Sequence, residues 1–223
     1  MIVAEQKPIN DIIKSVESFD RIAVAGCGVC VTVCMSGGEK EALGIANLLR
    51  LAFKNAGRSA YINVATPFRQ CDMEFLDENQ AELEDADCIL SMACGAGVQF
   101  MAEKFPDKVV VPGLNTTFIG VNRDLGYWTE MCQGCGNCIL EKTGGVCPVA
   151  RCSKSHFNGP CGGSATGKCE VDEQIDCGWQ LIYERLKRIG QLHKLAELEA
   201  PRDWSTSRDG GPRAMRRTDV EVP

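Results

Sequence analysis

The fold of this chain is decided by residues 21–57, which read RIAVAGCGVCVTVCMSGGEKEALGIANLLRLAFKNAG. The run RIAVAG at residues 21–26 is small, apolar and partly β-branched, and it predicts a strand buried on both faces. A helix is expected to follow, because Ser36 and Glu39 form a capping-box pattern before a stretch of helical spacing, and Gly57 can stop that helix. This stretch is therefore one strand–helix unit.

The next 54 residues repeat the same alternation. Short apolar runs at residues 60–65, 87–92 and 108–111 predict three further strands, and residues 74–84 and 98–105 between them have helical character. Strands that alternate with helices at this spacing form a mostly parallel sheet with helices on both faces. The sequence therefore predicts an α/β protein with a small, open, mostly parallel sheet.

Composition narrows the classes of partner. The chain has 223 residues and a formal net charge of −6, so we expect it to repel the phosphates of a nucleic acid. Its uncharged stretches are too short and polar to cross a bilayer, and its first residues lack a secretory pattern. We therefore expect a cytoplasmic protein. In that reducing compartment, 14 cysteines indicate metal ligation rather than disulfides.

Five cysteines follow the ends of the first three predicted strands. They are Cys27, Cys30, Cys34, Cys71 and Cys94. The carboxyl ends of parallel strands share one edge, so we expect these thiols to converge there. Four thiolates suffice for a [4Fe–4S] cluster, although Cys71 and Cys94 also fit ordinary buried positions. Cys88 lies inside the third strand and is assigned to the core.

Residues 132–177 carry eight further cysteines, at Cys132, Cys135, Cys138, Cys147, Cys152, Cys161, Cys169 and Cys177. This segment is rich in glycine and poor in apolar runs, so metal is expected to hold it folded. The spacing Cys132-x2-Cys135-x2-Cys138 presents three thiolates to one cubane cluster, and Cys147 before a proline resembles the end of a ferredoxin motif. It differs from ferredoxin in its wider gap before Cys147.

The remaining five cysteines of this segment leave alternatives open. They could complete the cluster of the Cys-x2-Cys-x2-Cys run and build another one. Zinc remains an alternative at Cys152, Cys161, Cys169 and Cys177, while the only histidines, His156 and His193, are not expected to be ligands. We therefore expect two or three [4Fe–4S] clusters in all, or zinc at one site.

The sequence after the cysteines predicts a helix and a tail. Residues 179–198 place apolar side chains on one face of an amphipathic helix, and residues from 201 onward show no periodicity. We expect four regions: an α/β domain at 1–125, a cluster-binding region at 126–178, the helix at 179–200 and an extended tail at 201–223. The tail and the helix are expected to contact a partner subunit.

The chain resembles a known family across nearly its whole length up to Trp204. The resemblance rests on GCGVCVTVCMSGGEKEALGI, RQCDMEF, ACGAGVQ, VPGLNTTF, CQGCGNC, GGVCPVARCSKSHFNGPCGG, GKCEV and IYERLK. These stretches resemble the methylenetetrahydrofolate reductase C-terminal domain family, which in acetogens and other anaerobes is a separate small subunit. By that resemblance the five loop cysteines form a first cluster motif. The second motif comprises Cys132, Cys135, Cys138, Cys147, Cys152, Cys161 and Cys169.

The resemblance implies an iron–sulfur protein of the methyl branch of the Wood–Ljungdahl pathway. A barrel that holds FMN needs about 250 residues, for which this chain has no room. We therefore expect an FMN-bearing catalytic subunit as partner, with this chain relaying electrons to it or docking a further electron-donor subunit. The competing hypothesis is a zinc-stapled, non-redox scaffold subunit of the same or another one-carbon assembly.

Overall fold

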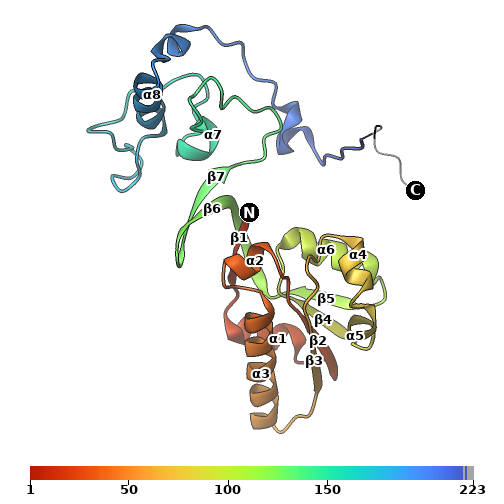
Figure 1. Cartoon of the computed structure of the whole chain (residues 1–223). Coiled ribbons are helices and arrows are strands. Elements are labelled where there is room, and N and C mark those ends of the chain that lie inside the picture. Colours follow the sequence, from red (N-terminus) through yellow and green to blue (C-terminus); the bar gives the residue numbers. More distant parts are fainter. Residues whose placement is uncertain (218, 220–223) are drawn as a thin grey trace. The chain divides into compact units, whose positions relative to one another are not determined.

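The computed structural model of the chain describes residues 1–217 and 219 (Figure 1). The chain divides into two compact units, Met1–Thr129 and Glu130–Pro223, and each is described here by itself. Within the described residues, no helix combines the length and the apolar character needed to cross a membrane.

The first unit contains the predicted parallel sheet. Its strands are β2 (Arg21–Ala25), β3 (Tyr61–Ala65), β4 (Cys88–Ser91) and β5 (Val109–Pro112), in the order β3-β2-β4-β5. All three neighbouring pairs are parallel, which confirms the predicted fold class. The chain leaves β2 toward β3 on one side and then returns to β4 on the other. This change of direction is a topological switch point.

Helices cover both faces of this sheet (Figure 1). They are α1 (Ile9–Val16), α2 (Cys30–Val33), α3 (Glu39–Asn55), α4 (Met73–Asp77), α5 (Gln80–Glu84) and α6 (Gly95–Lys104). Ile22 and Val24 of β2 pack in one core cluster with α1 and α3, while Ala23 and Ala25 pack with α4, α5 and α6 in another. Both sets are buried because side chains alternate along a strand and each face has its own helices.

A second sheet was not predicted. It consists of β1 (Ile2–Gln6), β6 (Leu114–Asp124) and β7 (Tyr127–Cys132), in the order β1-β6-β7. β1 pairs antiparallel with β6, and their register shifts between Val3 and Ala4. The two partners are separated by more than one hundred residues in sequence, and the five-residue β1 carries no local turn signal.

The predicted start of α3 is wrong by two residues. Its N-cap is Gly38, not Ser36, and the backbone amide of Gly38 donates to Oε2 of Glu41 at 3.0 Å. The reciprocal carboxylate of a capping box is thus present at Glu41 rather than at Glu39. Gly57 follows the helix with φ +69°, which confirms the predicted stop.

Two other predicted helices have different bounds. The segment at 74–84 forms two short helices, α4 and α5, instead of one. Asn79 lies between them, and its side chain donates back to the carbonyl of Phe75 at 3.0 Å, which favours a helix end. The helix predicted at 98–105 begins earlier, at Gly95, as α6.

The second unit has little regular structure. It contains α7 (Pro148–Arg151), α8 (Gly178–Arg188) and the 3₁₀ turns η1 (Leu192–Ala196), η2 (Trp204–Thr206) and η3 (Arg208–Gly210). The helix expected over residues 179–198 ends at Arg188, because Gly190 adopts a φ of +69° and the chain turns into η1. The expected tail contains η2 and η3, and its residues 218 and 220–223 lie outside the described part.

Candidate functional site

Three of the predicted ligands lie at one edge of the parallel sheet. Cys27 is the second residue after β2, Cys71 is in the loop after β3, and Cys94 caps the start of α6 after β4. All three strands are parallel, so their carboxyl ends share this edge. Cys27 and Cys94 follow the two strands that flank the switch point, which is where open α/β sheets bind ligands.

The thiols of this edge act on one another electrostatically. Burial raises the pKa of Cys27, backbone amides of Gln70 and Val29 that hydrogen-bond to its sulfur lower it, and negative charge on Cys94 and Cys71 raises it further. Three cysteines far apart in sequence are therefore brought together at this edge. A bound cation would favour their thiolate forms.

The buried side chain of Gln70 fixes the loop that carries Cys71. Its amide nitrogen donates to the carbonyls of Ala25 and Gly26 at 2.8 and 2.7 Å, and its oxygen accepts from Ser91 Oγ at 2.6 Å. These bonds join the loop after β3 to the ends of β2 and β4. Sequence reasoning missed Gln70, because nothing in its neighbourhood marks a glutamine as buried.

Glycines let these loops approach closely. A Cβ on Gly97 would lie 2.8 Å from the Cβ of Ala93 and 3.0 Å from that of Gln70. A Cβ on Gly28 would lie 3.2 Å from the carbonyl oxygen of Phe68, whose loop carries Cys71. The two glycines therefore allow backbone to pack against the edge where the three thiols lie.

The other two cysteines of the first group lie at α2. Cys30 begins this helix and Cys34 caps its end. The thiol of Cys34 donates to the carbonyl of Ile2 in β1 at 3.5 Å, and burial raises its pKa, with the charge of Cys30 adding to the effect. Cys34 therefore contacts the second sheet, and Cys30 is the less buried of the two.

Cys88 is confirmed as a core residue. It lies inside β4 with no exposed surface. Burial raises the pKa of its thiol to about 12, and the negative charge of Asp87 contributes a smaller part of this rise. A thiol with such a pKa is a poor metal ligand and a poor nucleophile at neutral pH.

The Cys-x2-Cys-x2-Cys run forms a loop after β7. Cys132 is the last residue of that strand, and its sulfur accepts a hydrogen bond from the backbone amide of Gly134 at 3.3 Å. The sulfur of Cys135 accepts from the guanidinium of Arg202 at 3.0 Å. Cys132 and Cys138 are exposed, whereas Cys135 is half-buried. Two of these three sulfurs thus have hydrogen-bond donors.

Cys147 and Cys152 lie at the two ends of α7. Cys147 is its N-cap, and Pro148 occupies the first helical position, where a missing N–H costs nothing. Cys152 is the C-cap and packs, together with Cys177, against the small core around Trp179. The Cys147-Pro148 pair therefore marks the start of α7, and this short helix fixes the spacing between Cys147 and Cys152.

Cys161 and Cys169 share surroundings. The sulfur of Cys161 accepts from the amide of Gly163 at 3.4 Å and lies 3.6 Å from Oε1 of Glu170. The pKa of Cys169 is lowered, chiefly by its hydrogen bond with the hydroxyl of Ser153 at 3.5 Å. Since Cys169 precedes Glu170, these two thiols belong to one neighbourhood of the chain.

Metal ligation itself stays a prediction for all twelve proposed ligands. Within residues 1–217 and 219, no three His, Cys, Asp or Glu side chains are arranged to hold a metal ion. The chemistry of the donors nevertheless fits a cluster: the candidates are thiols, which suit iron–sulfur clusters, and backbone amides donate to several of their sulfurs. Metal–thiolate bonds would supply the attraction that free thiols lack.

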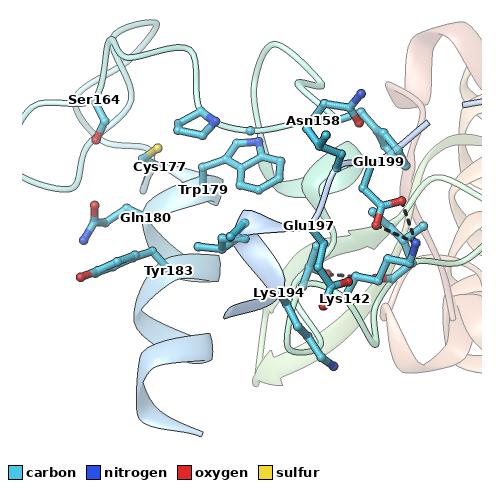
Figure 2. Close-up of a pocket in the computed structure, with 18 residues that line it drawn as sticks. Lys142, Asn158, Ser164, Cys177, Trp179, Gln180, Tyr183, Lys194, Glu197 and Glu199 are labelled. Atoms are coloured by element: carbon cyan, nitrogen blue, oxygen red, sulfur yellow. Dashed lines mark hydrogen bonds and ion pairs between the residues drawn. The ribbon is translucent and has the colours of Figure 1, made fainter. Parts of the chain in front are cut away.

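The second unit also contains a cavity of about 580 Å³ beside α8 and η1 (Figure 2). Trp179 and Tyr183 of α8 line it, and Cys177 lies at its border. Of the lysines that line it, Lys142 pairs with both carboxylate oxygens of Glu199 at 2.7 Å, and Lys194 donates to a backbone carbonyl at 2.6 Å. Both cations are therefore engaged by the protein itself.

One comparison with known proteins gives a match. Residues 111–205 match the family described as methylene-tetrahydrofolate reductase C terminal. The matched segment contains all eight cysteines from Cys132 to Cys177, and also Arg202. No curated protein and no solved structure matches the chain. The C-terminal part of the chain is thus linked to methylenetetrahydrofolate reductase, and for residues 1–110 the resemblance stays a prediction.

Proposed function

We propose that the chain is the iron–sulfur small subunit of a methylenetetrahydrofolate reductase complex and passes electrons to a separate FMN-bearing subunit. One observation carries the proposal: the thiol-rich loop after β7, with hydrogen-bond donors to its sulfurs, lies inside the segment that matches the reductase C-terminal domain. A [4Fe–4S] cluster, when bound, supplies one-electron transfer at a potential set by its surroundings.

At the sheet edge, Cys27, Cys71 and Cys94 would hold the first cluster. Cys30 or Cys34 would supply the fourth thiolate. The amides of Gln70 and Val29 donate to the sulfur of Cys27 and favour its thiolate form. The glycine-rich loops let the backbone approach the cluster.

In the second unit, Cys132, Cys135 and Cys138 would hold another cluster. Cys147, at the start of α7, is a candidate for its fourth ligand. Cys152, Cys161 and Cys169, with Cys177, would complete a third cluster or a zinc site. The core of this unit consists of Trp179, Ile182 and Leu186, so bound metal would supply much of its stability.

Hydride chemistry belongs to the partner in this proposal. A flavin barrel has eight parallel strands, whereas the parallel sheet of this chain has four. The described cavity lies in the small second unit and lacks a free cation for a flavin phosphate. The role left to this chain is to hold clusters close to the partner's flavin.

The test is electron delivery between separately prepared subunits. The full chain is reduced anaerobically, freed of reductant and mixed with the oxidised FMN-bearing subunit, and flavin absorption is followed. We expect rapid bleaching of the flavin and co-elution of the two subunits. The control is the same chain with Cys135→Ser. Equal bleaching by an iron-depleted chain, or flavin and reductase activity in this chain alone, would overturn the proposal.

A further inference from the structure

The end of the chain folds over the Cys-x2-Cys-x2-Cys run. We call residues 132–138 the cluster loop and residues 202–213 the clasp. The sequence predicts an extended tail here, because it lacks periodicity, and contact with a partner through Trp204. In the structure the clasp contains η2 and η3 and makes a set of hydrogen bonds to the cluster loop, while its contact with a partner stays a prediction.

Backbone contacts tie the clasp to the middle of the cluster loop. Thr206 Oγ1 donates to the carbonyl of Cys135 at 3.0 Å, and Arg213 Nη1 donates to the carbonyl of Gly134 at 2.7 Å. Gly136 has φ +82°, and a Cβ there would collide with the carbonyl of Thr206. A glycine is therefore needed at this position both for its conformation and for the approach of the clasp.

Arg202 is the residue of the clasp that reaches a candidate ligand. Its Nη2 lies 3.0 Å from Cys135 Sγ and 3.3 Å from the carbonyl oxygen of the same residue. A guanidinium donates through a fixed planar fork, so one side chain can serve both acceptors of Cys135.

Two aromatic rings hold the guanidinium of Arg202 in place. Its central carbon lies 5.0 Å from the ring centroid of Phe157 and 4.9 Å from that of Trp204. The two rings are themselves in an edge-on contact, with centroids 5.9 Å apart. Cation–π contacts on two rings fix both the position and the tilt of the planar group. Its distance from Cys135 Sγ is thus set by packing.

The charge of Arg202 is not neutralised by a carboxylate. Arg202 is half-buried, its Nε is buried without a hydrogen-bond partner, and no Asp or Glu of the described chain pairs with it. A partly buried cation without a counterion is costly unless a negative group compensates it. The group that lies against its Nη2 is Cys135 Sγ, which would carry negative charge once that sulfur binds a metal.

We propose that Arg202 is a positioning residue that raises the reduction potential of the cluster held by the cluster loop. The inference rests on the proposed function and deepens it. One-electron reduction adds one negative charge to the cluster and its thiolates, with dithionite as the electron donor in the test below. A fixed positive charge at Cys135 stabilises the reduced form more than the oxidised form, because charges interact strongly where water is partly excluded.

The experiment compares arginine variants of the full chain. Arg202→Gln removes the charge, Arg202→Lys keeps the charge but loses the fork and the stacking, and Arg216→Gln is the control on an exposed arginine of the same tail. Each protein is prepared anaerobically, its iron is quantified, and its midpoint potential is measured by dithionite titration with EPR detection. The signal of the cluster loop is the one that Cys135→Ser abolishes.

For Arg202→Gln we expect full iron content and an equilibrium constant for reduction of the cluster that is lower by about tenfold. This corresponds to a fall of about 59 mV in the midpoint potential of a one-electron couple. The midpoint potential should shift less in Arg202→Lys and should be unchanged in Arg216→Gln. If Arg202→Gln loses its iron, Arg202→Met, which also removes the charge, takes its place: a lowered potential supports the proposal and an unchanged potential overturns it. Full iron with an unchanged potential in Arg202→Gln also overturns it. Wild-type protein without iron would instead refute the proposed function.

Discussion

The hydroxyl of Ser91 donates a hydrogen bond of 2.6 Å to the side-chain oxygen of Gln70, and neither residue is exposed to solvent. Ser91 ends β4, whereas Gln70 belongs to the loop after β3 and also donates to the carbonyls of Ala25 and Gly26 at the end of β2. A single glutamine therefore joins the ends of three strands, at the edge where Cys27, Cys71 and Cys94 lie.

Gln70→Ala should destabilise the first unit. The change removes the acceptor of the buried Ser91 hydroxyl and the donor to the Gly26 carbonyl, while the Ala25 carbonyl keeps its bond from the backbone amide of Met92. We therefore expect a loss of about 2 kcal/mol in the free energy of unfolding. Urea denaturation followed by far-UV circular dichroism measures it. The control is Gln99→Ala, whose exposed side chain donates to a helical carbonyl and should cost less than about 0.5 kcal/mol. Equal costs would show that the Gln70 network does not hold the edge together.

Cys94→Ser and Cys88→Ala should have opposite effects on iron and stability. Cys94 caps α6 at the sheet edge, so its serine variant should lose iron from the first unit while the spectrum of the other cluster remains. Cys88 is buried inside β4, so Cys88→Ala should keep all iron but lose about 1–2 kcal/mol of stability through a small cavity. Iron analysis and urea denaturation separate the two. Full iron in both Cys94→Ser and Cys71→Ser would argue against a cluster at this edge.

The thiol of Cys88 should be inert and should make the first unit sensitive to alkali. With a pKa of about 12, only about 10⁻⁴ of this thiol is ionised at pH 8, so iodoacetamide should not modify it in the folded chain. The pKa of this thiol is higher in the folded than in the unfolded chain. The contribution of the neutral thiol to the free energy of unfolding is therefore fully present below pH 9 and is lost as the pH rises toward 12. The loss should be at most about 1.4 kcal/mol per pH unit. The Cys88→Ala variant should lack this alkaline loss of stability. If stability falls with pH in the same way in both proteins, the Cys88 thiol does not have the raised pKa.

Removal of metal should unfold the second unit and spare the first. The first unit has two core clusters on the faces of its sheet, whereas the described residues of the second unit bury one small cluster, around Ile182 and Leu186. Burial on that scale does not offset the entropy of ordering such a unit, so we expect metal to contribute. Hydrogen exchange before and after iron chelation checks this: protection should vanish in α8 and persist in β2 and β4. Retained protection of α8 would show that this unit folds without metal.

The parallel sheet could be predicted because its signals are local. RIAVAG and DCILSM are buried on both faces, so each strand reads as a continuous apolar run. The second sheet could not, because β1 is recognised only by pairing with a strand far along the chain. The same reason hid Gln70 and Arg202, whose roles depend on partners 21 to 67 residues away. Gly190 ended α8 where the apolar pattern alone continued.

The cysteine positions were predictable as candidates, but their grouping needed the fold. Spacing alone could not tell that Cys34 contacts β1 or that Cys152 and Cys177 pack against Trp179. Nor could it reveal that the tail returns to Cys135, because side-chain contacts of that kind leave no periodic trace in the sequence.

The metal content of the full chain decides most directly whether it is an iron–sulfur protein. The protein is purified anaerobically, and iron, acid-labile sulfide and zinc are quantified per chain. We expect brown protein with broad absorption near 400 nm and on the order of eight irons and eight sulfides per chain, or twelve of each if a third cluster is filled. Colourless protein with stoichiometric zinc and negligible iron would contradict this expectation and favour a scaffold subunit.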